Sequence, residues 1–177
     1  FSTDPTSAFG GVIALNTTVD SEVMQRMIEN QFIEVLIAPD FDDASLKILS
    51  KKPNIRALLG KDIASDQEEM KFITGVVLNQ KTDNADFSNM DLKTVTEIKP
   101  SKSELEDLIF AIKVAKHVKS NAIVIAKNQM TLGIGAGQMS RVVSTKIAFM
   151  KAEEEGLDIS NCVLASDAFF PFRDNID

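Results

Sequence analysis

The chain has 177 residues, with 19 Lys and Arg against 26 Asp and Glu and a net charge of −7. Hydrophobic residues make up 44% and charged residues 25%, a balance typical of globular proteins and unlike that of disordered chains. The acidic charge disfavours binding along a nucleic-acid backbone, and one His with one Cys cannot supply the usual zinc ligand sets.

No apolar run approaches the roughly 20 residues that a membrane-spanning helix requires. The single cysteine, Cys162, excludes an internal disulfide and fits a reducing cytosol. The chain begins at Phe1 without a signal segment, so we expect it to be part of a longer cytoplasmic protein.

The first 60 residues alternate short apolar runs with helical patterns. The predicted elements are a strand at 10–16, a helix from an Asp20 cap to about 31, a strand at 34–39, a helix from 42 or 43 that ends before Pro53, and a strand at 55–59. This β-α-β-α-β order predicts a layered α/β arrangement with parallel strands.

The rest of the chain has the same character, and we predict a lobe boundary between residues 70 and 71. The predicted elements are a strand at 72–80, a loop at 81–89, a helix from a Ser103/Glu106 capping box to about 118, a strand at 122–127, a turn at 128–129, a strand at 130–135, a helix at 140–155 and a strand at 161–167. Apolar stripes predict which helix residues face the sheet: Leu105, Leu108, Ile109, Ile112 and Ala115 in the first helix, and Val143, Ile147 and Met150 in the second.

Three segments place polar or small residues at strand ends, where α/β proteins often bind ligands. Residues 4–11, DPTSAFGG, are either a capped turn or part of a site. Residues 166–174, SDAFFPFRD, form either a core corner or an aromatic wall with acidic anchors.

The third segment runs from Lys119-Ser-Asn121 through residues 133–141, which read GIGAGQMSR. Its glycines allow either a tight strand-to-helix turn or a close backbone approach to an anion. The spacing lacks the third glycine of a dinucleotide fingerprint, which argues against a Rossmann dehydrogenase, and no Lys-Ser/Thr pair follows to make a P-loop. Arg141, at the helix start, is expected to bind an anion or pair with a carboxylate.

Two further residues carry reactive side chains. His117 near a helix end is a candidate base, although a structural or solvent-facing role is the commoner outcome there. Cys162 opens an apolar strand and is interpreted as a small buried hydrophobic residue rather than a nucleophile.

Four motifs in order, DPTSAFGG, KSNAIVIAKN, GIGAGQMSR and SDAFFPFRDNID, resemble the AICAR formyltransferase/IMP cyclohydrolase family of purine biosynthesis, specifically its formyltransferase part. The resemblance extends along nearly the whole chain. It implies a cytidine-deaminase-like α/β fold in two related lobes, at 1–70 and 71–177, without the deaminase zinc. It also implies a cytoplasmic homodimer that transfers a formyl group from 10-formyltetrahydrofolate to the 5-amino group of AICAR, with no metal.

The motifs also imply roles for individual residues. Asn121 would be the catalytic residue of this chain and would contact AICAR. The other AICAR-binding residues implied are Asp4, Arg141 and Phe169, and the folate-side residues are Val142 and Asp174.

The chain departs from the family pattern in one respect. The family's catalytic Lys-His pair lies before the DPTSAFGG motif, and His117 does not match it. We therefore expect this piece alone to be inactive and its parent to be active, with the cyclohydrolase domain lying elsewhere in the parent. The alternative is a noncatalytic nucleotide-binding or interface module of the same fold.

Overall fold

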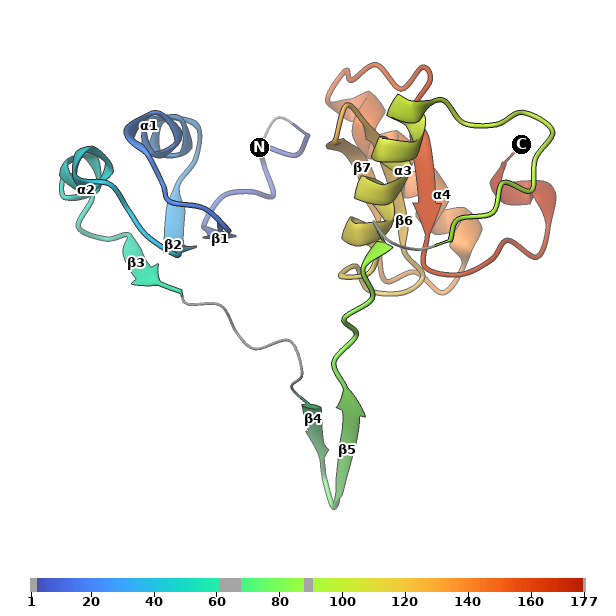
Figure 1. Ribbon diagram of the computed structural model, residues 1–177, viewed down its shortest axis with the longest axis horizontal. Helices are drawn as coiled ribbons and strands as arrows, with labels where there is room; N and C mark the ends of the chain where they lie inside the picture. Colours follow the sequence, from blue (N-terminus) through green and yellow to red (C-terminus); the bar gives the residue numbers. More distant parts are fainter. Residues whose placement is uncertain (1–2, 61–67, 88–90, 177) are drawn as a thin grey trace. The chain divides into compact units, whose positions relative to one another are not determined.

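The computed structural model describes residues 3–60, 68–87 and 91–176 (Figure 1). The chain divides into two compact units, Thr3–Ala85 and Asp86–Asp177, which are described separately. Both contain helices packed on sheets, so the α/β class is confirmed. The sequence-based boundary at 70/71 falls within a hairpin of the first unit, and the assignment of the formyltransferase lobes stays a prediction.

The first unit contains a parallel sheet of order β1-β2-β3, formed by Gly11–Ala14, Ile33–Ala38 and Arg56–Leu59. Helices α1 (Ser21–Asn30) and α2 (Asp43–Leu49) lie on the same face of this sheet (Figure 1). Both begin at aspartates: the Asp20 and Asp42 side chains accept hydrogen bonds from Val23 N at 2.8 Å and Ser45 N at 2.6 Å. The predicted β-α-β-α-β unit is confirmed.

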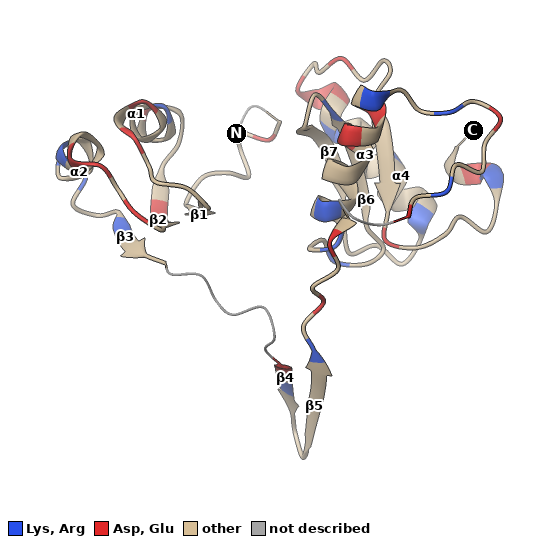
Figure 2. Cartoon of the chain, viewed as in Figure 1, with Lys and Arg blue, Asp and Glu red and all other residues tan. Residues whose placement is uncertain are grey.

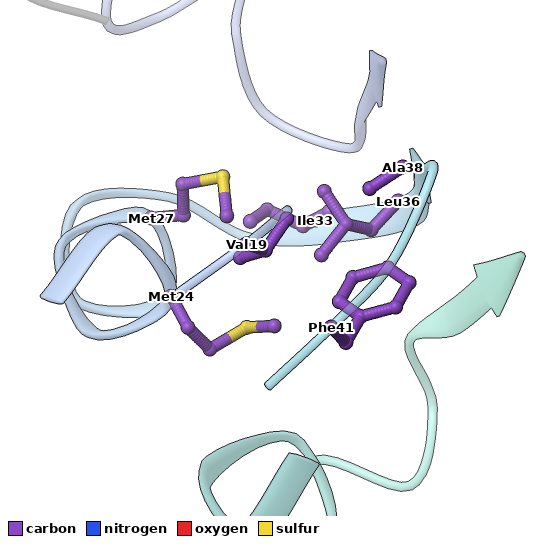
Figure 3. Packing of buried hydrophobic residues seen from close by; sticks show 7 residues of the cluster. All are labelled: Val19, Met24, Met27, Ile33, Leu36, Ala38 and Phe41. Atoms are coloured by element: carbon purple, nitrogen blue, oxygen red, sulfur yellow. The ribbon is translucent and has the colours of Figure 1, made fainter. Parts of the chain in front are cut away.

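The core of this unit lies between the sheet and α1. Figure 3 shows the side chains of its buried cluster meeting in this layer: Val19, Met24, Met27, Ile33, Leu36, Ala38 and Phe41. Met24 and Met27 come from the α1 stripe, three residues apart, as an amphipathic helix requires.

The single strand predicted at 72–80 is wrong. The structure has an antiparallel hairpin there, with β4 at Glu68–Ile73 and β5 at Val76–Lys81. Gly75 turns the chain at a φ of +81°, a conformation that glycine adopts without steric cost. Because apolar residues lie on both sides of this turn, the sequence pattern predicted one continuous strand instead of two.

The second unit has three layers. Its sheet has the order β7-β6-β8, formed by Met130–Gly135, Ile123–Lys127 and Val163–Ser166, with β6 antiparallel to both neighbours. Helix α3 (Lys102–Ala115) covers one face, packing on Val124 and Ala126. Helix α4 (Arg141–Glu154) covers the other, packing on Ile123 and Ile125. The three strands carry one charged residue, Lys127, whereas charges gather on helices and loops (Figure 2).

Helix α3 begins two residues earlier than predicted. Its capping box uses Ser101 and Glu104 rather than Ser103 and Glu106, with Ser101 N donating to Glu104 Oε2 at 2.7 Å. Its most deeply buried residues are Asp107, Ala111 and Ala115. The Asp107 carboxylate accepts hydrogen bonds from the backbone N–H groups of Asn128 and Gln129, which ties α3 to the predicted turn between β6 and β7.

The predicted inward face of α4 is wrong for two of its three residues. Val143 and Met150 are 41% and 45% exposed, whereas Ile147 is half-buried. The buried residues of this helix are small: Ser144, Thr145, Ala148 and Ala152. The cause lies in β7, where Gly133 and Gly135 bring the strand against the helix backbone. A Cβ at Gly135 would lie 1.8 Å from Ser144 O, so only glycine permits this approach.

No helix within the described ranges is long and apolar enough to span a membrane.

Candidate functional site

Helix α4 begins beside a pocket of about 330 Å³ in the second unit. The first residues of the helix form one wall, and the segment after β8 forms the other. The lining residues are Ser140, Arg141, Val142, Ala168, Phe169, Pro171, Phe172, Asp174 and Asn175. Four residues that the family resemblance assigned to ligand binding therefore meet at one pocket: Arg141, Val142, Phe169 and Asp174.

The aromatic segment after β8 contributes one Phe to the core and two to the wall of the pocket. Phe170 packs against the core cluster beneath α4. Phe169 and Phe172 are 81% and 73% exposed and line the pocket, where a flat ligand ring could stack on them. Asn175, 7% exposed, accepts a hydrogen bond from the Thr145 hydroxyl at 3.3 Å and so fastens this segment to α4.

The start of α4 is electrostatically suited to an anionic group. The side chain of its N-cap residue, Ser140, makes no capping hydrogen bond, and no acidic residue lies in its first turn, unlike α1, α2 and α3. The partial positive charge of the helix N-terminus is therefore left without an acidic side chain in that turn, next to the Arg141 guanidinium.

The side chain of Asn121 connects this helix start to β6. Its Nδ2 donates to Gln138 O at 3.0 Å and Met139 O at 3.1 Å, and its Oδ1 accepts from Arg141 Nη2 at 2.9 Å. The Ser144 hydroxyl donates to Asn121 O at 2.7 Å. Asn121 thus holds the loop before α4, and its Oδ1 keeps one lone pair that could accept a hydrogen bond from a ligand.

Ser166 and Asp167, at the end of β8, lie in the candidate segment 166–174, where Asp167 was one of the possible acidic anchors, but neither residue had been assigned a contact. Arg141 Nη1 donates to the Ser166 hydroxyl at 2.9 Å and forms an ion pair with Asp167 Oδ1. Burial raises the pKa of Asp167, but hydrogen bonds from Ser120, Arg141 and Ala122 outweigh it and hold that pKa below its usual value. In the sequence, the signal that could have identified Asp167 as a partner of Arg141 is its carboxylate at the end of the last strand.

The other candidates lie elsewhere. Asp4 belongs to the first unit, where its Oδ1 accepts a hydrogen bond from Ser7 N at 2.9 Å and forms the capped turn considered above. His117 is exposed just after α3, and Cys162 is partly buried against the core cluster beneath α4. Burial raises the pKa of the Cys162 thiol, as expected of a residue that is not a nucleophile.

The side chains in the parts of the chain that the structure describes include no cluster of three or more His, Cys, Asp or Glu that could hold a metal ion.

Comparisons with known proteins point to one family. Residues 1–151 match a family model described as AICARFT/IMPCHase bienzyme. The chain is 52% identical over 178 residues to the bifunctional purine biosynthesis protein PurH of Xanthomonas oryzae pv. oryzae (strain PXO99A), covering 100% of this chain and 34% of that protein. It is 51% identical, with the same coverage, to the PurH proteins of Xanthomonas axonopodis pv. citri (strain 306) and Xanthomonas campestris pv. campestris (strain 8004). The chain therefore spans about a third of the length of these curated relatives.

Proposed function

The chain belongs to the AICARFT/IMPCHase bienzyme family, and on that premise we propose that it forms part of the formyltransferase half of a bifunctional purine biosynthesis enzyme. The family match confirms the resemblance inferred from the four motifs. The reaction would transfer a formyl group from 10-formyltetrahydrofolate to the 5-amino group of AICAR. The parent chain would also carry the IMP cyclohydrolase.

The grouping of Arg141, Val142, Phe169 and Asp174 around one pocket is the observation that carries this proposal. Four residues assigned from two motifs lie together although they span 34 positions of the chain, from 141 to 174. Arg141 offers N–H donors to AICAR, and the exposed ring of Phe169 offers a face for a planar heterocycle. The Asp174 carboxylate can accept hydrogen bonds from N–H groups of a folate ring.

The chemistry sets three requirements. The amine of AICAR is conjugated into its ring and is a poor nucleophile, so the site must hold it against the formyl carbon, accept its proton and stabilise the tetrahedral oxyanion. Asn121, which lies just before β6 and is neutral at all pH values, would orient the amine. Proton acceptance would fall to the Lys-His pair that the family carries in a segment before residue 4, with Asp4 as a further AICAR-binding group.

Several finer points are part of the same proposal. We propose the cytidine-deaminase-like fold in two related lobes, 10-formyltetrahydrofolate as cosubstrate, a transfer that needs no metal, and a cytoplasmic homodimer. Each is implied by the family resemblance, and the layered α/β units are consistent with the fold.

The test is formyl transfer by the purified full-length protein, measured as tetrahydrofolate released from 10-formyltetrahydrofolate with and without AICAR. AICAR-dependent release is expected. Binding of AICAR without any release would instead identify the noncatalytic nucleotide-binding module.

A further inference from the structure

The guanidinium of Arg141 is held by three groups from two neighbouring strand ends. Nη2 donates to Asn121 Oδ1, just before β6, and Nη1 donates to Ser166 and Asp167, at the end of β8. Arg141 is shielded from bulk water over most of its length, since its side chain is only 14% exposed. Of its five N–H donors, these bonds use three, and two remain for a ligand in the adjoining pocket.

Asp167 is itself fixed on rigid backbone. It follows β8 directly, where Ser166 is paired with Ile123 of β6, and its own N–H donates to Ala122 O at 3.3 Å. Its carboxylate also accepts hydrogen bonds from Ser120 and Ala122. Its side chain is 19% exposed and, unlike Arg141, Asp167 is not among the residues that line the pocket.

We infer that Asp167 and Ser166 are positioning residues, which hold the Arg141 guanidinium in the orientation that binds AICAR. This inference rests on the proposed function. A free arginine side chain loses rotamer entropy when it binds a ligand, whereas one already held by three acceptors has lost most of it beforehand. The carboxylate supplies the charge that keeps the guanidinium in place, and the Ser166 hydroxyl sets its rotation.

Two roles of Asp167 predict opposite effects on AICAR binding. A carboxylate that merely neutralises Arg141 would compete with an anionic ligand, so its removal would tighten AICAR binding. The loss of a carboxylate that positions Arg141 would weaken AICAR binding instead.

The experiment uses the full-length protein and compares wild type with Asp167→Asn, Ser166→Ala, Arg141→Ala and the Arg141→Ala/Asp167→Asn double variant. We expect Asp167→Asn to raise the KM for AICAR by about 10- to 100-fold with a smaller change in kcat, since a held contact group is lost. Ser166→Ala, which removes the hydrogen bonds that the hydroxyl accepts from Arg141 Nη1 and from Ala168 N but removes no charge, should raise it by about 2- to 5-fold. In the Arg141→Ala background, Asp167→Asn should change KM by no more than about 2-fold, because the inferred route of action, through the Arg141 guanidinium, is gone.

Asp158→Asn is the matched control. Asp158 accepts a hydrogen bond from Lys127 Nζ at 2.7 Å at the opposite end of β6, outside the pocket. This variant removes an Asp–cation pair from the same sheet and should leave the KM for AICAR within about 2-fold of wild type. Melting temperatures establish whether each variant is folded. If Asp167→Asn does not fold, the KM for AICAR of Ser166→Ala tests the inference in its place.

Three results would overturn the inference while the proposed function stands. In the first, the wild type is active and Asp167→Asn leaves its KM for AICAR unchanged or lowers it. In the second, Asp167→Asn does not fold and Ser166→Ala leaves the KM for AICAR unchanged. In the third, Asp167→Asn raises the KM for AICAR as much in the Arg141→Ala background as in the wild type. A wild type that neither binds AICAR nor releases tetrahydrofolate would overturn the proposed function itself, and the inference with it.

Discussion

Replacing Gly135 with alanine tests how α4, which carries Arg141, is seated on the sheet. The added Cβ would lie 1.8 Å from Ser144 O and 2.5 Å from Ser144 C, both in the helix backbone. Ordinary contact begins near 3.4 Å, so α4 would have to retreat by roughly 1.5 Å, because neither backbone can yield by itself.

We expect this change to destabilise the second unit by about 3 kcal/mol or more, the upper range for overpacking a core. It should also weaken AICAR binding, since the shift would separate the Ser144 hydroxyl from Asn121 O and move Arg141 away from its partners. Gly75→Ala is the control: no atom lies within 4 Å of the position that a Cβ would take there, and only the φ of +81° makes alanine unfavourable, by about 1–2 kcal/mol.

Hydrogen exchange of peptides from β6, β7 and α4 in the full-length protein measures the effect where it should arise. Gly135→Ala should speed exchange in these peptides, and Gly75→Ala should not. Protection in α4 equal to that of wild type would refute the close-packing argument.

Four other predictions concern the site. Arg141→Ala in the full-length protein should weaken AICAR binding by about 1.5–3 kcal/mol, measured by calorimetry, and unchanged affinity would contradict its assigned role. Asn121→Asp should lower kcat/KM by about 10- to 100-fold, because its carboxylate would face the carbonyls of Gln138 and Met139; wild-type kinetics would argue against this geometry. Exhaustive chelation should leave formyl transfer intact, and activity that returns only with added zinc would show the metal-free proposal to be wrong. The 177-residue chain alone, which spans 34% of the length of its relatives, should show no formyl transfer. Robust turnover would mean that a residue of this chain is the base.

Local sequence signals predicted most of the secondary structure, because those signals act over a few residues. Asp20 and Asp42 cap their helices through bonds to N–H groups three residues ahead. The turn at Asn128 and Gln129, both with positive φ, was predicted from residue type. The four motifs likewise sufficed to identify the family, since each is a contiguous run of residues.

The errors arose where two patterns were locally equivalent. Residues 101–106 contain two overlapping S-x-x-E patterns, and only the first forms the capping box. In α4 the apolar stripe predicted large residues at the sheet, but Gly133 and Gly135 on another element leave room only for Ser144 and Ala148. The burial of a helix face depends on the surface that it meets, which its own sequence does not contain.

The same limit applies to the site. The family, the α/β class and the candidate residues Asn121 and Arg141 all follow from the amino-acid sequence alone. Ser166 and Asp167 reach Arg141 only through the packing of the folded chain, because the β6–β8 register sets Ser166 beside Ile123 and the glycine contacts seat α4 on β7. Pairing between residues 25 or more positions apart is decided by the packing of whole elements, and no local pattern encodes it.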